Sequence, residues 1–572
     1  MTSTSSPPRP SDGRPRPADD SVPPSAPPRA ARRWTLPAAV VVLGILWLGV
    51  VKAIEWPALR RDTFAAGVST DAAAFAYAGE LLRHGAAPYL SYWDHKPPLV
   101  HLINAAALAL SGGAVWGVWW ASFVALAAAV VLAAWTLRRA GLGAGPAAVG
   151  TALYVIAIPA VHSSNLTEGY AMPLQWASVL MLLGTADRVY RRRYDVAAGA
   201  LLGVLAALAF FLRPNLVGAM AAVALTATIE AARRREGRRW LAWTAGSAGG
   251  AAIVALLVLG WLAAYGAVDA FVDQVFRYNM IYTGAGLRDR VKAAYAGLEV
   301  ATRHAPAMLP LAGWLAALLQ RVGPARAGRG ERDLAVLTLA LVWAPIELAL
   351  ASMAGRPYDH YFVPVLAPLA LLTAVLLREL LAGLPRGRAA VLAGALAAAA
   401  ALPALADFAR GLDEPARNLR SAQVTAAAEY VRTRTAPGTP VFVWGHAADV
   451  YFFSGRPSAS RFIYPLALVT PGYVDAALVD GLLAELRARP PVLLLDQRTQ
   501  LLPPLGRWDP AWHYPDQEAT TTRPATWSAT PALERFYDHV ARHYRLVDSV
   551  GPERWPVYRL RSERPRSAEA PS

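Results

Sequence analysis

The stretch TDAAAFAYAGELLRHGAAPYLSYWDHKPPLVHL, residues 70–102, joins an amphipathic pattern to a cluster of charged and aromatic residues. Phe75, Ala78 and Leu82 recur at helical spacing, which predicts a helix with one apolar face. Asp71 falls in the first turn of this helix, where the helix dipole favours a carboxylate. The tandem prolines that follow predict an extended approach to the next apolar run. The stretch therefore indicates a polar loop at the edge of an apolar layer.

The composition of the whole chain indicates a membrane protein with several spans. Of 572 residues, 55% are hydrophobic and only 17% are charged, whereas soluble domains carry about 25% charged residues. The net charge of +16 comes largely from arginines in short loops between apolar runs, a pattern that sets membrane topology and does not form a nucleic-acid-binding stripe. The absence of cysteine excludes disulfides, thiolate metal sites and thiol catalysis.

About eleven apolar runs are long enough to cross a hydrocarbon layer of about 30 Å as helices. They lie near residues 35–53, 113–136, 143–161, 169–186, 196–212, 214–230, 240–264, 305–321, 334–354, 359–378 and 388–407. The expected fold class is therefore a polytopic α-helical membrane domain, over residues 34–410.

Arginines occupy every second loop between these runs, and such basic loops face the cytoplasm. The N-terminus is then cytoplasmic, including residues 1–33, whose Pro, Ser and Arg content predicts a disordered tail. The loop at 54–112 and the region after 407 lie outside. The high Ala, Arg, Gly and Pro content is typical of a bacterium, so the expected location is the inner (cell) membrane.

The apolar segment 99–110 is too short to be a further span. As a helix, the run from Pro98 to Ser111 would measure about 21 Å, and counting it as a span would place the later arginines outside. We expect a re-entrant or interfacial helix on the outer side.

The outer loops collect ionisable side chains, which are costly at membrane depth and therefore indicate a functional site. These residues are Asp71, Asp94, Lys96, Glu168, Arg213, Arg356 and His360. A structural interpretation also stands for two of them, because Asp94 and Lys96 could form an interfacial ion pair. A lipid-phosphate-linked donor fits this chemistry well. Lysine and arginine could hold its phosphate oxygens, and a carboxylate such as Asp71 could take the proton of an acceptor hydroxyl.

These motifs resemble the outer loops of the GT-C glycosyltransferases, over most of residues 36–407. Residues 70–102 are similar to the first outer loop of the family 39 or protein mannosyltransferase-like set, which includes the Rgt-type and lipid A aminoarabinose transferases. The segment NLTEGYAMPL, residues 165–174, resembles their later acidic-loop motif. The segment GRPYDHYFVPVLAPLALL, residues 355–372, resembles their late H-Y-x-x-P motif.

The resemblance implies a GT-C fold and an inverting transfer of a sugar from a polyprenyl-phosphate donor to a lipid, glycan or protein acceptor. It implies three acidic catalytic residues: Asp71 as the base, Asp94 before the K-P-P element, and Glu168. This sequence departs from many members by carrying Ala72 after Asp71, and His95 between Asp94 and Lys96.

Further residues complete the expected site. Lys96 aligns with a phosphate-contacting lysine of the family, and Arg213, Arg356 and His360 are expected beside it on the donor phosphate. Aromatic and basic residues of the outer loops are expected to line an acceptor groove; these are Tyr89, Tyr92, Tyr358 and Arg277. No histidines show metal-ligand spacing, so no metal site and no cofactor are expected, and a divalent-metal requirement stays open.

Residues 411–560 alternate short apolar strands with helical segments, which predicts an extracytoplasmic α/β domain. Residues 561–572 are expected to be disordered. His446, Asp449 and Arg456 follow the first predicted strand, either as a solvated loop or as contacts to a substrate.

Two other functions remain open at this point. A lipid or solute transporter or flippase would need internal repeats and broken helices near mid-membrane, and no repeat is evident. A non-catalytic relative could act in envelope assembly through its outer domain.

Overall fold

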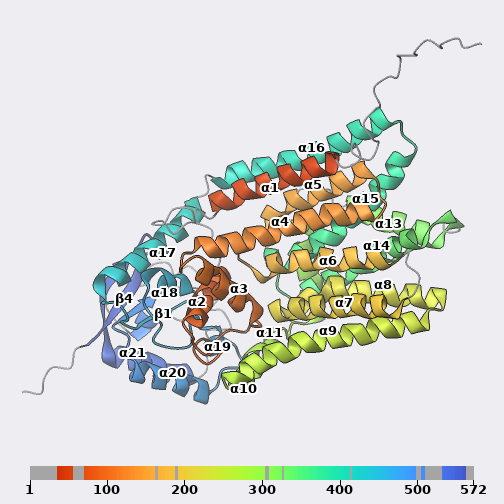
Figure 1. Ribbon diagram of the computed structural model, residues 1–572. Helices are drawn as coiled ribbons and strands as arrows, with labels where there is room; N and C mark the ends of the chain where they lie inside the picture. Colours follow the sequence, from red (N-terminus) through yellow and green to blue (C-terminus); the bar gives the residue numbers. More distant parts are fainter. Residues whose placement is uncertain are drawn as a thin grey trace, which may run out of the picture.

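A computed structural model of the chain describes residues 35–55, 70–161, 165–186, 191–302, 308–324, 328–412, 415–497, 504–508 and 531–561. Long helices run side by side in one bundle, and a smaller α/β domain covers one end of it (Figure 1). Two short helices, α2 (Thr70–Arg83) and α3 (Leu99–Leu110), lie between the bundle and this domain (Figure 1). The predicted tails and residues 56–69 of the first outer loop lie outside the described residues, Arg561 excepted.

Each of the predicted apolar runs overlaps an observed helix. These helices are α1 (Thr35–Glu55), α4 (Trp116–Arg139), α5 (Ala144–Val161), α6 (Thr167–Ala186), α7 (Arg192–Leu212), α8 (Gly218–Arg234), α9 (Gly237–Ala264), α13 (Met308–Val322), α14 (Glu331–Ala351), α15 (Leu366–Ala382) and α16 (Arg386–Leu412). Within the described residues, six helical segments are long and apolar enough to cross a membrane: Trp116–Arg139, Arg192–Leu212, Pro214–Arg234, Gly237–Ala264, Glu331–Ala351 and Asp359–Ala382. The chain is thus a multi-pass membrane protein, while the count of about eleven spans and their orientation stay predictions.

Shorter elements connect the long helices near the α/β domain. They are the 3-10 turns η2 (Pro214–Val217) and η5 (Asp359–Val365), helices α10 (Val268–Phe271), α11 (Tyr278–Tyr282) and α12 (Leu287–Ala301), and the π-helical turn η3 (Val272–Arg277). Helix α3 matches the segment that was predicted to be helical and too short to span. Its twelve residues give about 18 Å of helix.

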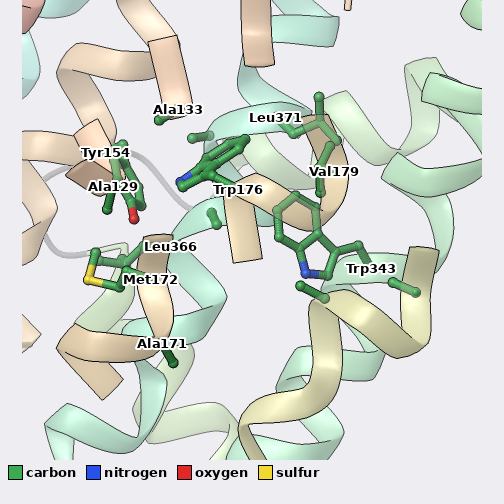
Figure 2. Close-up of a cluster of buried hydrophobic side chains, with 14 of the residues drawn as sticks. Ala129, Ala133, Tyr154, Ala171, Met172, Trp176, Val179, Trp343, Leu366 and Leu371 are labelled. Carbon is green, nitrogen blue, oxygen red and sulfur yellow. The ribbon is translucent and has the colours of Figure 1, made fainter. Parts of the chain in front are cut away.

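Large aromatic side chains fill the centre of the bundle. The rings of Trp176 and Trp343 meet edge to face, with centroids 5.5 Å apart, and Tyr154 meets Trp176 in the same way at 5.6 Å (Figure 2). All three side chains are buried. Edge-to-face aromatic pairs add about 0.5–1.5 kcal/mol beyond area burial, so these contacts fix α5, α6 and α14 against one another.

Helices α7 and α9 pack with their backbones in close contact, at glycines on both helices. A Cβ added at Gly203 would collide with the carbonyl oxygen of Ser247, and one at Gly250 would collide with the carbonyl oxygen of Ala200. Within membranes, small residues spaced four apart allow this kind of close helix packing. Gly199 and Gly246 complete the pattern, one on each helix.

We predict that Gly203→Ala lowers the thermal unfolding midpoint of the detergent-solubilised protein. Overpacking of a closed contact costs about 1–3 kcal/mol. Gly249→Ala is the matched control, because a Cβ there meets nothing within 4 Å and Ala is the better helix former. An equal effect of the two substitutions would contradict close packing between α7 and α9.

The C-terminal part of the chain carries a four-stranded sheet in the order β1-β2-β4-β3. The strands are β1 (Val441–Trp444), β2 (Leu493–Asp496), β3 (Tyr544–Val550) and β4 (Trp555–Leu560). Strands β1 and β2 are parallel, and β4 is antiparallel to both of its neighbours. All four strands lie within residues 411–560, where the sequence predicts alternating strands and helices. The α/β architecture is confirmed, while the domain boundaries stay predictions.

Helices pack around this sheet. They are α17 (Pro415–Arg434), α18 (Ala448–Ser454), α19 (Leu466–Val469), α20 (Ala476–Ala488) and α21 (Pro531–His543), with a 3-10 turn η6 (Leu505–Trp508). Every residue of β1 and β2 is buried, as expected for parallel strands covered on both faces.

Candidate active site

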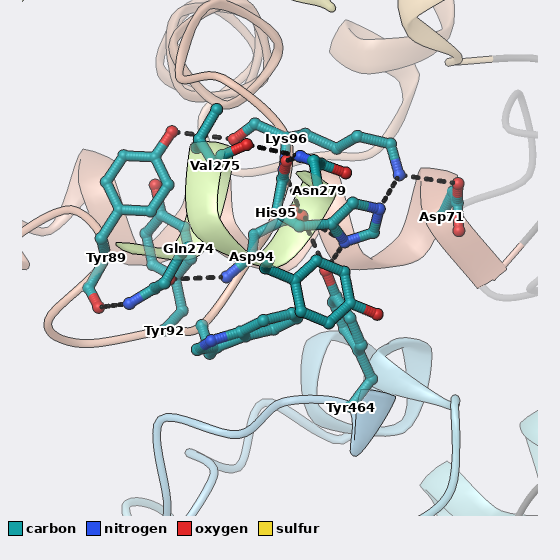
Figure 3. Close-up of polar contacts among 12 residues, drawn as sticks. Asp71, Tyr89, Tyr92, Asp94, His95, Lys96, Gln274, Val275, Asn279 and Tyr464 are labelled. Carbon is teal, nitrogen blue, oxygen red and sulfur yellow. Dashed lines mark hydrogen bonds and ion pairs between the residues drawn. The ribbon is translucent and has the colours of Figure 1, made fainter. Parts of the chain in front are cut away.

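The loop between α2 and α3 is held in shape by hydrogen bonds to its own backbone and to the 268–282 segment. Tyr89 is fully buried, and its hydroxyl donates to the carbonyl of Lys96 at 2.8 Å. The side-chain amide of Gln274 donates to the carbonyl of Tyr89 at 2.8 Å, and its oxygen accepts from the backbone N–H of Asp94 at 3.1 Å (Figure 3). Asn279 donates to the carbonyl of His95 at 2.8 Å. The loop therefore presents its charged residues on a fixed backbone.

Asp94 is completely buried and fully occupied by donors. Its Oδ1 accepts from the hydroxyl of Tyr464 at 2.6 Å and from the backbone N–H of Lys96 at 2.9 Å. Its Oδ2 lies 2.9 Å from Nε2 of His101. Burial alone would raise the pKa of this carboxyl, but the contact to His101 and the surrounding positive charge hold the pKa well below its usual value. Asp94 is thus an anchor that positions its neighbours.

Lys96 faces two partners. Its Nζ lies 3.0 Å from Nε2 of His95 and 3.5 Å from Oδ2 of Asp71 (Figure 3). Burial and the charge of Lys96 lower the pKa of His95 to about 3, so the neutral ring accepts a hydrogen bond from the lysine. The distance to Asp71 is long for a hydrogen bond, which leaves the ammonium group able to take another anion.

Asp71 is the more accessible half of this pair. Its side chain is 26% exposed, against 7% for Lys96. Burial acts to raise the pKa of Asp71, but the charges of Lys96 and His446 outweigh it and hold the pKa well below its usual value. Asp71 therefore presents an ionised carboxylate at neutral pH.

A second charged pair lies beside the first. Nη1 of Arg213 lies 2.5 Å from Oε1 of Glu168, and Oε2 of Glu168 accepts from the hydroxyl of Thr167 at 2.9 Å. The guanidinium of Arg213 also sits 3.8 Å from the ring centroid of Tyr361, in a cation–π contact. His360 lies close enough to interact with the charges of Asp71, Glu168, Lys96 and Arg213. The two pairs therefore belong to one charged cluster.

The other expected site residues fall into two groups. Arg356 stacks over the ring of Tyr282 at 5.4 Å, and Tyr358 stacks on His360 at 5.9 Å, next to the charged cluster. By contrast, Arg277 is 57% exposed and pairs with Asp273 at 3.0 Å. Tyr92 is buried, and its hydroxyl lies 3.1 Å from Nδ1 of His101, so it supports α3 as Tyr89 supports the loop.

The C-terminal domain adds two residues that were not among the expected site residues. Nε2 of His446 lies 3.8 Å from Oδ1 of Asp71, and Tyr464 binds Asp94. Both come from segments more than 350 positions later in the chain. The sequence singles out His446 either as part of a solvated loop or as a substrate contact, and no local pattern marks Tyr464. Among the described residues, no group of three or more His, Asp or Glu side chains is arranged to hold a metal ion.

No protein-family model matches the sequence, and no curated protein matches it. Solved structures do match. ArnT from Cupriavidus metallidurans in the apo state is 17% identical, with a TM-score of 0.54, over 91% of this chain and 98% of that chain. The same protein bound to undecaprenyl phosphate is 14% identical, with a TM-score of 0.53, over 90% of this chain and 97% of that chain.

The chain has the GT-C fold. This agreement confirms the fold implied by the sequence resemblance. The archaeal oligosaccharyltransferase AglB from Archaeoglobus fulgidus, in complex with an inhibitory peptide and a dolichol-phosphate, matches at a TM-score of 0.49 and 11% identity, over 82% of this chain and 70% of that chain.

The neutral state of His95 predicts a pH dependence of stability for this GT-C protein. Because the pKa of His95 is about 3 in the folded state and about 6.5 in an unfolded chain, the unfolded chain binds the extra proton between these values. The contribution of His95 to the free energy of unfolding is fully present above pH 6.5. It falls as the pH is lowered, by about 2 kcal/mol from pH 7 to pH 5.

The free energy of unfolding in detergent, measured at pH 7 and pH 5, checks this. We expect His95→Gln to flatten the dependence and His84→Gln to leave it unchanged, since the His84 side chain is 63% exposed. An unchanged slope in His95→Gln would show that His95 is protonated in the folded protein.

Proposed function

We propose that this protein is a membrane glycosyltransferase that moves a sugar from a polyprenyl-phosphate donor to an acceptor hydroxyl, with inversion, on the outer face of the membrane. The observation that carries the proposal is the pairing of an accessible carboxylate, Asp71, with a buried lysine, Lys96, at 3.5 Å. The fold supports the donor class, because ArnT, which shares it, was solved with undecaprenyl phosphate.

The donor phosphate would bind the cationic side of the cluster. Lys96 and Arg213 are held in place by Asp94 and Glu168, and Arg356 lies nearby on Tyr282. As the bond between the sugar C1 and the phosphate oxygen breaks, the phosphate keeps the electron pair and its charge increases. Fixed cations stabilise such a developing charge without reorganisation.

Asp71 would take the acceptor proton as the acceptor oxygen attacks C1 from the opposite face. In the empty site Lys96 stabilises the carboxylate and makes Asp71 a weak base. A bound phosphate competes for Lys96, and loss of that nearby charge raises the basicity of Asp71. Donor binding therefore prepares the base. Asp94 and Glu168 act in this proposal by positioning Lys96 and Arg213, since the described contacts occupy both carboxylates.

The membrane orientation is part of the proposal. The basic loops support a cytoplasmic N-terminus, and the α/β domain would then lie outside a bacterial inner membrane. The charged cluster adjoins that domain through His446 and Tyr464, so the acceptor would be an envelope lipid, glycan or protein.

We predict that Asp71→Asn abolishes sugar transfer, by at least a hundredfold, because the amide cannot accept the proton. The measurement is restoration of the missing envelope sugar when purified protein is added to membranes of a deletion strain. Asp289→Asn on α12 is a control that keeps transfer. Full transfer by Asp71→Asn would contradict the role of Asp71 as the base. Lipid translocation in liposomes without any acceptor would favour a flippase.

We predict that Lys96→Ala weakens binding of undecaprenyl phosphate at least tenfold. A hydrogen bond to a charged group contributes about 1.5–3 kcal/mol, and about 1.4 kcal/mol corresponds to a factor of ten. Binding to the purified protein in lipid nanodiscs is the measurement, with the exposed Lys292→Ala as the matched control. Equal affinities of the two variants would remove Lys96 from the donor site.

A further inference from the structure

Local contacts hold His446 in a defined position at the edge of the C-terminal sheet. Strands β1 and β2 are parallel, so their carboxyl ends share one edge, which is where open α/β sheets bind ligands. His446 follows β1 and Gln497 follows β2, and the backbone N–H of His446 donates to the side-chain oxygen of Gln497. Gly445 is required between them, because a Cβ there would collide with the Gln497 side chain.

The position of His446 relative to the membrane domain is fixed by contacts on either side of it. Its ring packs on Tyr464 with centroids 4.7 Å apart, and Tyr464 binds Asp94 at 2.6 Å. The backbone N–H of Trp93 donates to the carbonyl of Arg461 at 2.7 Å. The backbone N–H of Ser458 donates to the hydroxyl of Tyr77, on α2, at 2.9 Å. The α/β domain is thus fastened both to α2 and to the loop that carries Lys96.

The two oxygens of Asp71 face different partners. Oδ2 faces Lys96 at 3.5 Å, and Oδ1 faces Nε2 of His446 at 3.8 Å. The second distance is too long for a hydrogen bond, but one oxygen atom can lie about 2.8 Å from both atoms. The exposed side chains are on this side: Asp71 is 26% exposed and His446 is 19% exposed. Both side chains are thus partly open to solvent, while Nε2 of His446 itself is buried, so an acceptor oxygen between them would approach from the Asp71 side.

We propose that the acceptor hydroxyl binds between Asp71 and His446, so that the C-terminal domain supplies half of the acceptor site. This inference rests on the proposed function. Nε2–H of His446 donates to the acceptor oxygen, and the acceptor O–H donates to Oδ1 of Asp71. The second lone pair of the oxygen attacks C1 of the sugar, the O–H proton passes to Asp71, and the phosphate leaves with the electron pair of the broken C1–O bond.

The test compares His446→Ala and His446→Gln in the full-length protein. One measurement is the initial rate at which purified protein restores the missing sugar to membranes of a deletion strain, which supply donor and acceptor. The other is the affinity for undecaprenyl phosphate in nanodiscs, which reports folding and the donor side. His84→Ala is the matched control, because that histidine is exposed and outside the cluster.

We expect His446→Ala to lower the rate at least tenfold, with an undecaprenyl phosphate affinity within twofold of wild type. His446→Gln keeps an N–H donor and should retain at least a third of the wild-type rate. An unchanged rate in His446→Ala would overturn the inference, as would a loss of undecaprenyl phosphate affinity equal to that of Lys96→Ala, or a Gln variant as slow as Ala.

Failure of the proposed function gives a different set of results from failure of this inference alone. In that case wild-type protein restores no envelope sugar, or Asp71→Asn and Lys96→Ala are both fully active, and the inference falls with it. Failure of the inference alone occurs in an active wild-type protein that Asp71→Asn inactivates and His446→Ala does not slow.

Discussion

The buried carboxylate of Asp94 is the constraint on which the site depends. A carboxylate removed from water is costly unless hydrogen bonds replace its hydration. Here the replacements come from three places: Lys96 in the same loop, His101 on α3 and Tyr464 in the C-terminal domain. Moving any of them away removes one of the hydrogen bonds that a buried charge needs. The need to satisfy one carboxylate therefore holds the loop, α3 and the α/β domain in one arrangement, with Lys96 facing Asp71.

A second polar contact extends this arrangement to the Glu168–Arg213 pair. Asn104 on α3 and Asn165, just before α6, exchange hydrogen bonds of 3.0 and 2.9 Å. Asn165 also donates to the carbonyl of Ala72 on α2 at 3.0 Å. The turn that leads to Glu168 is thus fixed to the helix that carries Asp71. Since α6 is packed in the aromatic centre of the bundle, the rigid bundle sets the distance between the two charged pairs.

The sequence predicts the helices and the charged residues of this site better than the contacts between them. Apolar runs long enough to approach the width of a bilayer core, and one run too short to cross it, follow from length alone, and each overlaps a helix. The charged residues of the outer loops stand out because ionisable groups are rare in apolar surroundings. Their partners do not stand out. Tyr464 lies on a short loop of a different domain, where no periodicity marks a residue. His446 is marked only by its place after the first predicted strand, and the role of each depends on tertiary contacts across more than 350 positions. The same reason explains why the sequence does not show that donors enclose Asp94, that the hydroxyl of Tyr89 binds the loop backbone, or that the hydroxyl of Tyr92 contacts the side chain of His101.

In the proposed mechanism, Lys96 exchanges Asp71 for the donor phosphate. A cryo-electron-microscopy structure of the protein with undecaprenyl phosphate tests it most directly. We predict a phosphate oxygen about 2.8 Å from Nζ of Lys96, a separation between Lys96 and Asp71 longer than the present 3.5 Å, and unchanged contacts around Asp94. A phosphate bound away from Lys96, with the Lys96–Asp71 contact intact, would contradict it.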